Sequence, residues 1–156
     1  MDKEKIFFIG PDKKINPVLF SDLAEFWAEK ICNAGLTVKK NMKTNKIEKK
    51  LEKNKISQIR KFYDEVLFFT DRIKAGEDYS IILPYIKMLN AKAAYAEGRN
   101  LITPEFKIFI KQCLDCLDDK DIKTLEIFQN FFEAFMGYYK YFESKYKTDK
   151  TIIEED

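Results

Sequence analysis

The chain contains no histidine among its 156 residues. Histidine is the usual base beside a catalytic serine or cysteine, a common metal ligand, and one half of the arginine–histidine pair of helical ribonucleases. The sequence therefore excludes these familiar hydrolytic sites. Glycine is scarce as well, and its five copies are isolated from one another. This spacing excludes the glycine-rich loops that cradle phosphates in nucleotide-binding enzymes.

Long apolar runs are also missing. No stretch approaches the roughly 18 residues that a membrane-spanning helix requires. The N-terminal segment Ile6-Phe7-Phe8-Ile9 is too short for the core of a signal peptide. We therefore expect a cytoplasmic protein with no membrane partner.

Cysteine is too rare for a disulfide framework, with three copies in a chain that looks intracellular. Cys113 and Cys116 have the spacing of a zinc or redox pair, but they fall inside a predicted helix and no further ligands complete a tetrahedral site. We interpret them as thiols at the edge of the core. A nearby acidic group could suggest metal-ion chemistry, but a solvated connector between helices is the simpler interpretation: Asp115, Asp118, Asp119 and Asp121. No metal or cofactor is expected.

Helical signals dominate what is present. The chain is most simply one domain, and its 46% hydrophobic and 15% aromatic content can fill a sizeable core. Apolar residues recur at helical spacing in five segments, whereas strand signals are almost absent. The predicted helices run from Asn16 to Gly35, from Ser57 to Gly76, from Asp78 to Gly98, from Thr103 to Asp118, and from Asp121 to about Tyr146.

These segments predict an all-α fold, an antiparallel bundle of about five helices with a lysine-rich connector between the first and second. Pro84 should kink the third helix or mark its true start. Gly98 should end it in a left-handed conformation, and Thr103 should cap the fourth. We expect an irregular arm over residues 1–14, one domain over 15–146, and a frayed tail over 147–156.

Positive charge is concentrated in one part of the chain. Residues 39–61 carry ten basic side chains against two acidic ones, whereas the whole chain has a net charge of only +2. Such a cluster indicates a polyanionic partner. A solvated lysine-rich loop is the alternative. Against it, Arg60 and Lys61 continue the charge onto a helix whose first turn also offers Gln58 as a hydrogen-bond donor to phosphate or sugar oxygens.

The same helix start carries a resemblance to a known family. Ser57–Val66 (SQIRKFYDEV) resembles the signature of the small helical subunit of type III-A CRISPR effector complexes, the Csm small-subunit family. Three further stretches are similar in the same order: Asn16–Phe20 (NPVLF), Ala93–Arg99 (AAYAEGR) and Phe131–Tyr141 (FFEAFMGYYKY). Family members often carry histidine where Tyr139 stands, so no polar contact is carried over to that position.

The resemblance implies a non-catalytic subunit. Copies would stack along a ribonucleoprotein filament in antiviral defence, contacting guide RNA, target RNA and other subunits, while other subunits cut RNA. Basic side chains would neutralise phosphates without reading bases, because base pairing supplies the sequence recognition. The candidate RNA-binding residues are Lys50, Lys53, Lys55, Gln58, Arg60 and Lys61, with Arg99 and Lys140 carried over from the matching segments.

Several alternatives stay open at this point. Arg99 could equally be a helix-end partner in a salt bridge or cap. Phe68 lies on the polar face of its predicted helix, where it could contact a neighbouring subunit or be a scattered surface aromatic. A stand-alone helical adaptor that binds nucleic acid or protein is the alternative function, and an enzyme is a more distant one.

Overall fold

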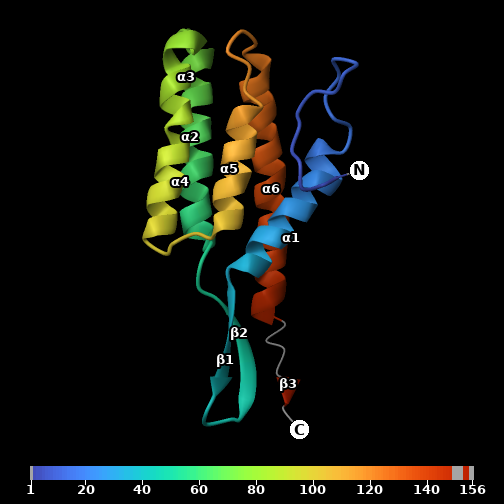
Figure 1. Cartoon of the computed structure of the whole chain (residues 1–156), viewed down its shortest axis with the longest axis vertical. Coiled ribbons are helices and arrows are strands. Elements are labelled where there is room, and N and C mark those ends of the chain that lie inside the picture. Colours follow the sequence, from blue (N-terminus) through green and yellow to red (C-terminus); the bar gives the residue numbers. More distant parts are fainter. Residues whose placement is uncertain (1, 149–152, 155–156) are drawn as a thin grey trace.

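The computed structural model describes residues 2–148 and 153–154. Four rows of helix lie side by side along the molecule (Figure 1). They are α2 (Ile56–Lys74), the consecutive helices α3 (Tyr79–Lys87) and α4 (Leu89–Gly98), α5 (Pro104–Asp115) and α6 (Lys123–Thr148). Successive rows run in opposite directions, as short connections between packed helices require. The predicted antiparallel arrangement is therefore present.

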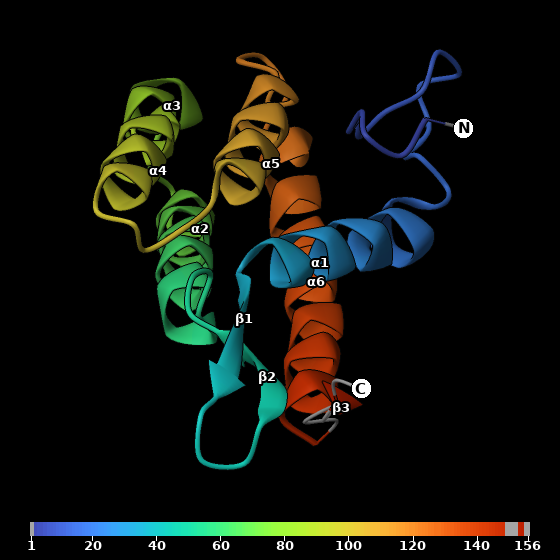
Figure 2. The same cartoon turned by 60° about the horizontal axis from the view of Figure 1, so that its bottom comes forward.

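The first helix crosses this bundle instead of joining it. A five-residue π-helix (Leu19–Leu23) leads into α1 (Ala24–Ala34), which packs across α6 (Figure 2). Trp27 of α1 is buried against Phe109 of α5, with ring centroids 5.9 Å apart. Gly35 follows α1 directly, so the predicted end of this helix is confirmed.

Aromatic side chains of α6 form the centre of the core. Phe109 of α5 stacks on Phe135 of α6 with ring centroids 4.6 Å apart. Contacts from α1 and α2 bury further sides of α6. Because several elements pack around α6, it buries more aromatic side chains than a single apolar stripe would hold. The fully buried ones are Phe128, Phe131, Phe132, Phe135 and Tyr139.

Two helix ends differ from the sequence prediction. The third predicted helix is interrupted at Met88, one turn after Pro84, so that Pro84 lies inside α3 and does not start it. Gly98 is the last residue of α4, and the left-handed residue that ends this segment is Asn100, with φ of 61°. Asparagine tolerates this conformation better than most residues because its short polar side chain can hydrogen-bond locally.

The lysine-rich connector is a β-hairpin, so the all-α prediction is only approximately correct. Strand β1 (Leu36–Asn41) pairs with β2 (Lys46–Leu51) in antiparallel register, from Leu36 opposite Leu51 to Asn41 opposite Lys46. The left-handed residue Asn45 (φ 56°) ends the turn. The strands were missed because lysines occupy both faces and no apolar face alternates with a polar one.

Both terminal segments contact the domain. Phe8 of the irregular arm is buried against Phe128 and Phe131, with ring centroids 6.2 and 6.0 Å away. In the segment expected to fray, Lys147 and Thr148 continue α6, and the short strand β3 (Ile153–Glu154) pairs with β2. The rest of that segment, 149–152 and 155–156, lies outside the described residues. None of the helices that the structure describes combines the length and apolarity needed to cross a lipid bilayer.

Candidate nucleic-acid interface

A buried asparagine anchors the basic segment where it enters α2. Asn54 adopts a left-handed conformation (φ 58°), and its backbone nitrogen donates a hydrogen bond to the backbone carbonyl of Leu101 at 3.0 Å. Its side chain donates to the Ile31 carbonyl at 2.9 Å and to the Thr103 hydroxyl at 2.7 Å, and accepts from the Thr103 amide at 2.9 Å. The Tyr139 hydroxyl donates to the Asn54 carbonyl. These bonds join the segment to α1, α6 and the α4–α5 loop.

The bond to Asn54 also corrects one local prediction. Thr103 stands at the N-cap position of α5, as expected, but its hydroxyl makes no capping bond to the helix. Its oxygen instead accepts from the Asn54 side chain. The predicted cap residue therefore serves to position the segment between the hairpin and α2.

The base of the hairpin is closed by a tight backbone contact. The amide nitrogens of Glu52 and Lys53 both donate to the Gly35 carbonyl, at 3.0 and 3.2 Å. A Cβ atom on residue 35 would lie 2.1 Å from the Lys53 carbonyl oxygen. Glycine is required here by close approach of two backbones, and the contact fixes the backbone that carries Lys53.

Lysines cover the hairpin and the segment that follows it. Lys50 and Lys55 are exposed, and Lys53 is half-buried. Lys39 forms an ion pair with Glu52, and the hydrogen bond from Lys39 lowers the pKa of the Glu52 carboxyl. Only one other acidic residue, Glu48, lies within residues 39–61, so basic side chains outnumber acidic ones ten to two in this segment.

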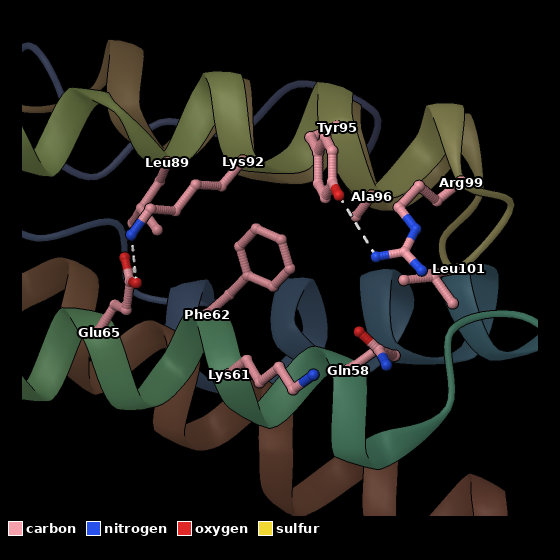
Figure 3. A pocket seen from close by; sticks show the side chains of 10 residues that line it. All are labelled: Gln58, Lys61, Phe62, Glu65, Leu89, Lys92, Tyr95, Ala96, Arg99 and Leu101. Carbon is pink, nitrogen blue, oxygen red and sulfur yellow. Dashed lines mark hydrogen bonds and ion pairs between the residues drawn. The ribbon is translucent and has the colours of Figure 1, made fainter.

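Three of the predicted RNA-binding residues meet in a groove between α2 and α4. The groove has a volume of about 320 Å³. Gln58 and Lys61 reach it from α2, and Arg99 reaches it from the end of α4 (Figure 3). The other lining residues are Phe62, Glu65, Leu89, Lys92, Tyr95, Ala96 and Leu101. Residues separated by about forty positions in the sequence thus form one basic-rimmed surface.

Arg99 contacts an aromatic ring and not a carboxylate. Its guanidinium carbon lies 5.6 Å from the centroid of the Tyr95 ring, and its Nη1 donates to the Tyr95 hydroxyl at 3.3 Å. In the described part of the chain no ion pair involves Arg99. It does occupy the C-cap position of α4. The salt-bridge alternative is therefore not supported, and the cation remains accessible beside the groove.

Two predicted RNA-binding residues lie elsewhere. Arg60 is exposed on α2 but lies two positions from Gln58, about 200° around the helix, so it does not line the groove. Lys140 of α6 lies 3.6 Å from the carboxylate of Glu143, whose side chain is only 3% exposed. Both residues of this ion pair belong to α6, and Lys140 does not line the α2–α4 groove.

Phe68 is exposed, as its position on the helix predicted. Its relative exposure is 56%, and the Arg72 guanidinium lies 5.4 Å from its ring centroid. Phe68 lies one and two turns beyond Glu65 and Lys61 along the same edge of α2. Its role in subunit contact stays a prediction.

Sequence reasoning missed Tyr95 as a site residue. Tyr95 is 66% exposed, although aromatic residues at helical spacing usually belong to the core. A signal was available, since the alanines that pack inward, Ala93 and Ala96, leave Tyr95 on the outer face four residues before Arg99. Lys92 was missed too, and it forms an ion pair with Glu65 across the groove.

The cysteine pair has the character of core thiols. Cys113 is buried, and burial raises the pKa of its thiol well above the usual value. Burial also raises the pKa of Cys116 to about 11. Zinc binds thiolates, which these environments disfavour. Within the described residues no group of three potential metal ligands occurs.

Comparison with known proteins gives a family assignment. A family model described as Csm2 Type III-A matches residues 29–145. The chain belongs to the Csm2 family. It is therefore a small subunit of a type III-A CRISPR effector complex, in which it assembles with other Csm subunits. The match includes α2, the hairpin and the groove. No curated protein and no solved structure matched the chain.

Proposed function

We propose that this Csm2 subunit is a non-catalytic RNA-binding component of its effector complex. Copies stack along the paired guide and target RNA and hold the phosphate backbone without reading its sequence, in cytoplasmic antiviral defence. Family membership supports the place in the complex. The observation that carries the RNA contact is the basic segment 39–61, which folds into the hairpin and the first turns of α2.

The arrangement of this segment suits phosphate binding. Lys50, Lys53 and Lys55 lie along the second strand and the link to α2, and Lys61 follows on the helix. The bonds of Asn54 and the close contact at Gly35 hold the backbone between the hairpin and α2, so the backbone that carries these cations is ordered before RNA binds. A preorganised cluster loses less entropy on binding than a flexible loop would.

Sequence independence follows from the chemistry of the contacts. Lysine and arginine contacts to phosphate neutralise charge and release counterions, and they carry no base information. In a guide–target complex, base pairing already supplies the recognition. We therefore assign a supporting role to this subunit and no chemical step.

The salt dependence of RNA binding tests this proposal. The isolated subunit and the reconstituted complex would be titrated with two single-stranded RNAs of equal length and unrelated sequence, neither of them complementary to the guide. We expect similar affinities for both, falling linearly on a plot of log affinity against log salt. A strong preference for one sequence, or an affinity insensitive to salt, would contradict backbone binding.

A further inference from the structure

The groove between α2 and α4 has a floor that phosphate binding does not explain. Phe62 of α2 and Leu89 and Ala96 of α4 line it with apolar surface, below the polar residues of the rim (Figure 3). Phosphates interact with cations and amides, and they gain nothing from an apolar floor. An apolar base with a few polar groups at the edge is instead typical of a site that encloses part of a small molecule.

The rim offers a planar stacking surface. The Tyr95 ring lies on the α4 side of the groove, to one side of Phe62, and the Arg99 guanidinium lies beside its hydroxyl, 5.6 Å from the ring centroid. Proteins that bind single-stranded RNA stack unpaired bases on aromatic rings and on arginine planes. A paired base offers no free ring face inside a duplex, so this surface suits an unstacked base.

Charge at the rim complements a nucleotide. Lys92 is neutralised by Glu65, whereas Lys61 and Arg99 have no ion-pair partner in the described part of the chain. These two cations stand on opposite walls of the groove, one on α2 and one at the end of α4. Gln58 lies near Arg99 and carries both a donor and an acceptor, which can match the edge of any base.

The size of the groove is consistent with one nucleotide. Its volume of about 320 Å³ lies at the lower limit of small-molecule sites, which run from roughly 300 to 1,000 Å³. A helix from another protein would need a longer trough with several anchoring pockets along it.

We propose that the α2–α4 groove takes one unstacked nucleotide of a single-stranded RNA segment. The base lies against Tyr95 above the apolar floor, and the flanking phosphates contact Lys61 and Arg99. This inference rests on the proposed function, since RNA is the partner in both. It adds a contact with the base that tolerates any sequence, because every base has a ring face.

The test compares a short single-stranded RNA with the same sugar–phosphate chain lacking its bases. Both probes carry equal charge, so backbone contacts alone bind them equally. We expect the wild-type chain to bind the base-bearing probe more tightly. Tyr95→Ala should lower that affinity by roughly 5-fold to 150-fold, the range that corresponds to base–aromatic stacking. It should leave the affinity for the baseless probe and the salt dependence unchanged.

Two variants serve as controls. Tyr95→Phe keeps the ring and should retain most of the preference for bases. Tyr85→Ala removes an exposed tyrosine of α3 that does not line the groove, and it should have no effect. Because Tyr95 is mostly exposed, the thermal midpoint should stay the same in all three variants. A free nucleoside monophosphate should compete only weakly, since it lacks the neighbouring phosphates.

Other outcomes have distinct meanings. Equal, salt-dependent binding of both probes with no effect of Tyr95→Ala would overturn the groove inference and leave the proposed function standing. Absence of salt-dependent binding by the isolated subunit and by the complex would overturn both. Competition by the mononucleotide as strong as by the RNA would make the groove a free-nucleotide site. Failure of Tyr95→Ala to join the complex, with base preference intact, would assign the groove to a neighbouring protein.

Discussion

The hydroxyl of Tyr139 donates a hydrogen bond to the backbone carbonyl of Asn54. This bond joins the middle of α6 to the link between the hairpin and α2, and both residues are fully buried. Burial raises the pKa of the Tyr139 hydroxyl, so it stays protonated and remains a donor. Tyr139 thus helps to hold the basic segment in place.

The first prediction concerns Asn54. Asn54→Ala removes side-chain bonds to Ile31 and Thr103 and places alanine at a φ of 58°. Buried groups that lose their partners cost about 1–3 kcal/mol each, and the left-handed conformation costs alanine about 1–2 kcal/mol more. We expect urea unfolding to show a loss of at least about 3 kcal/mol. Asn54→Gly should lose less, because glycine adopts this φ freely. Equal losses would show that the conformation is unimportant.

The second prediction compares two glycines. Gly35→Ala places a Cβ atom 2.1 Å from the Lys53 carbonyl oxygen, so the backbone at the hairpin base must shift. Overpacking of this kind typically costs about 1–3 kcal/mol. Gly137→Ala is the matched control, because that residue lies within α6 with open space around it. It should be neutral or stabilise by up to about 1 kcal/mol. Thermal unfolding measures both, and equal midpoints would contradict the close contact.

The third prediction concerns assembly. Phe68→Asp changes a largely exposed ring, so the isolated chain should keep its circular dichroism spectrum and melting temperature. Incorporation into the effector complex should fall, because a charge replaces the apolar side chain that we predict to contact a neighbouring subunit. Phe69→Asp is the control, since Phe69 is buried and its replacement should unfold the chain. Normal incorporation of Phe68→Asp, measured by co-purification, would remove Phe68 from the interface.

The fourth prediction concerns the thiols. Replacing Cys113 and Cys116 with alanine should leave RNA affinity unchanged, and purified wild-type protein should release no zinc. The raised pKa of Cys116, about 11, favours its neutral thiol in the folded state. The neutral Cys116 thiol therefore contributes fully to the stability of the fold below the unfolded pKa of about 8.5. This contribution is lost as the pH rises toward 11, because the buried thiol must then ionise. Stoichiometric zinc by metal analysis would overturn this interpretation.

Apolar residues at helical spacing predicted most of the helices, because each of these helices buries one face and exposes the other. The apolar stripes of α2 and α5 were visible in the sequence, and each is buried in the structure. The hairpin was not predictable in this way. Val38 is 62% exposed, so the strands have no buried face and depend on backbone pairing, which leaves no alternation of apolar and polar residues.

The candidate site was predicted in part. Charge density and the resemblance at Ser57–Val66 singled out Gln58 and Lys61. The groove itself could not be predicted, because it depends on how α4 packs beside α2. Only that packing brings Tyr95 and Arg99 opposite Lys61.

We propose that the cluster from Lys50 to Lys61 holds RNA phosphates. The most direct test of this proposal changes Lys53, Lys55, Arg60 and Lys61 together to alanine. These side chains are exposed or half-buried, so thermal stability should change little. The control changes four exposed lysines elsewhere, Lys14, Lys74, Lys120 and Lys123, and removes the same charge.

The measurement is the slope of log affinity against log salt for single-stranded RNA. Each phosphate contact contributes about −0.7 to this slope. The slope of the cluster variant should therefore be shallower than that of the wild type by roughly 3 if all four side chains contribute. Its loss of affinity should be similar for unrelated sequences, and the control should keep nearly the wild-type slope. An unchanged slope for the cluster variant, in both the isolated subunit and the assembled complex, would contradict the account and make the segment a solvated hairpin.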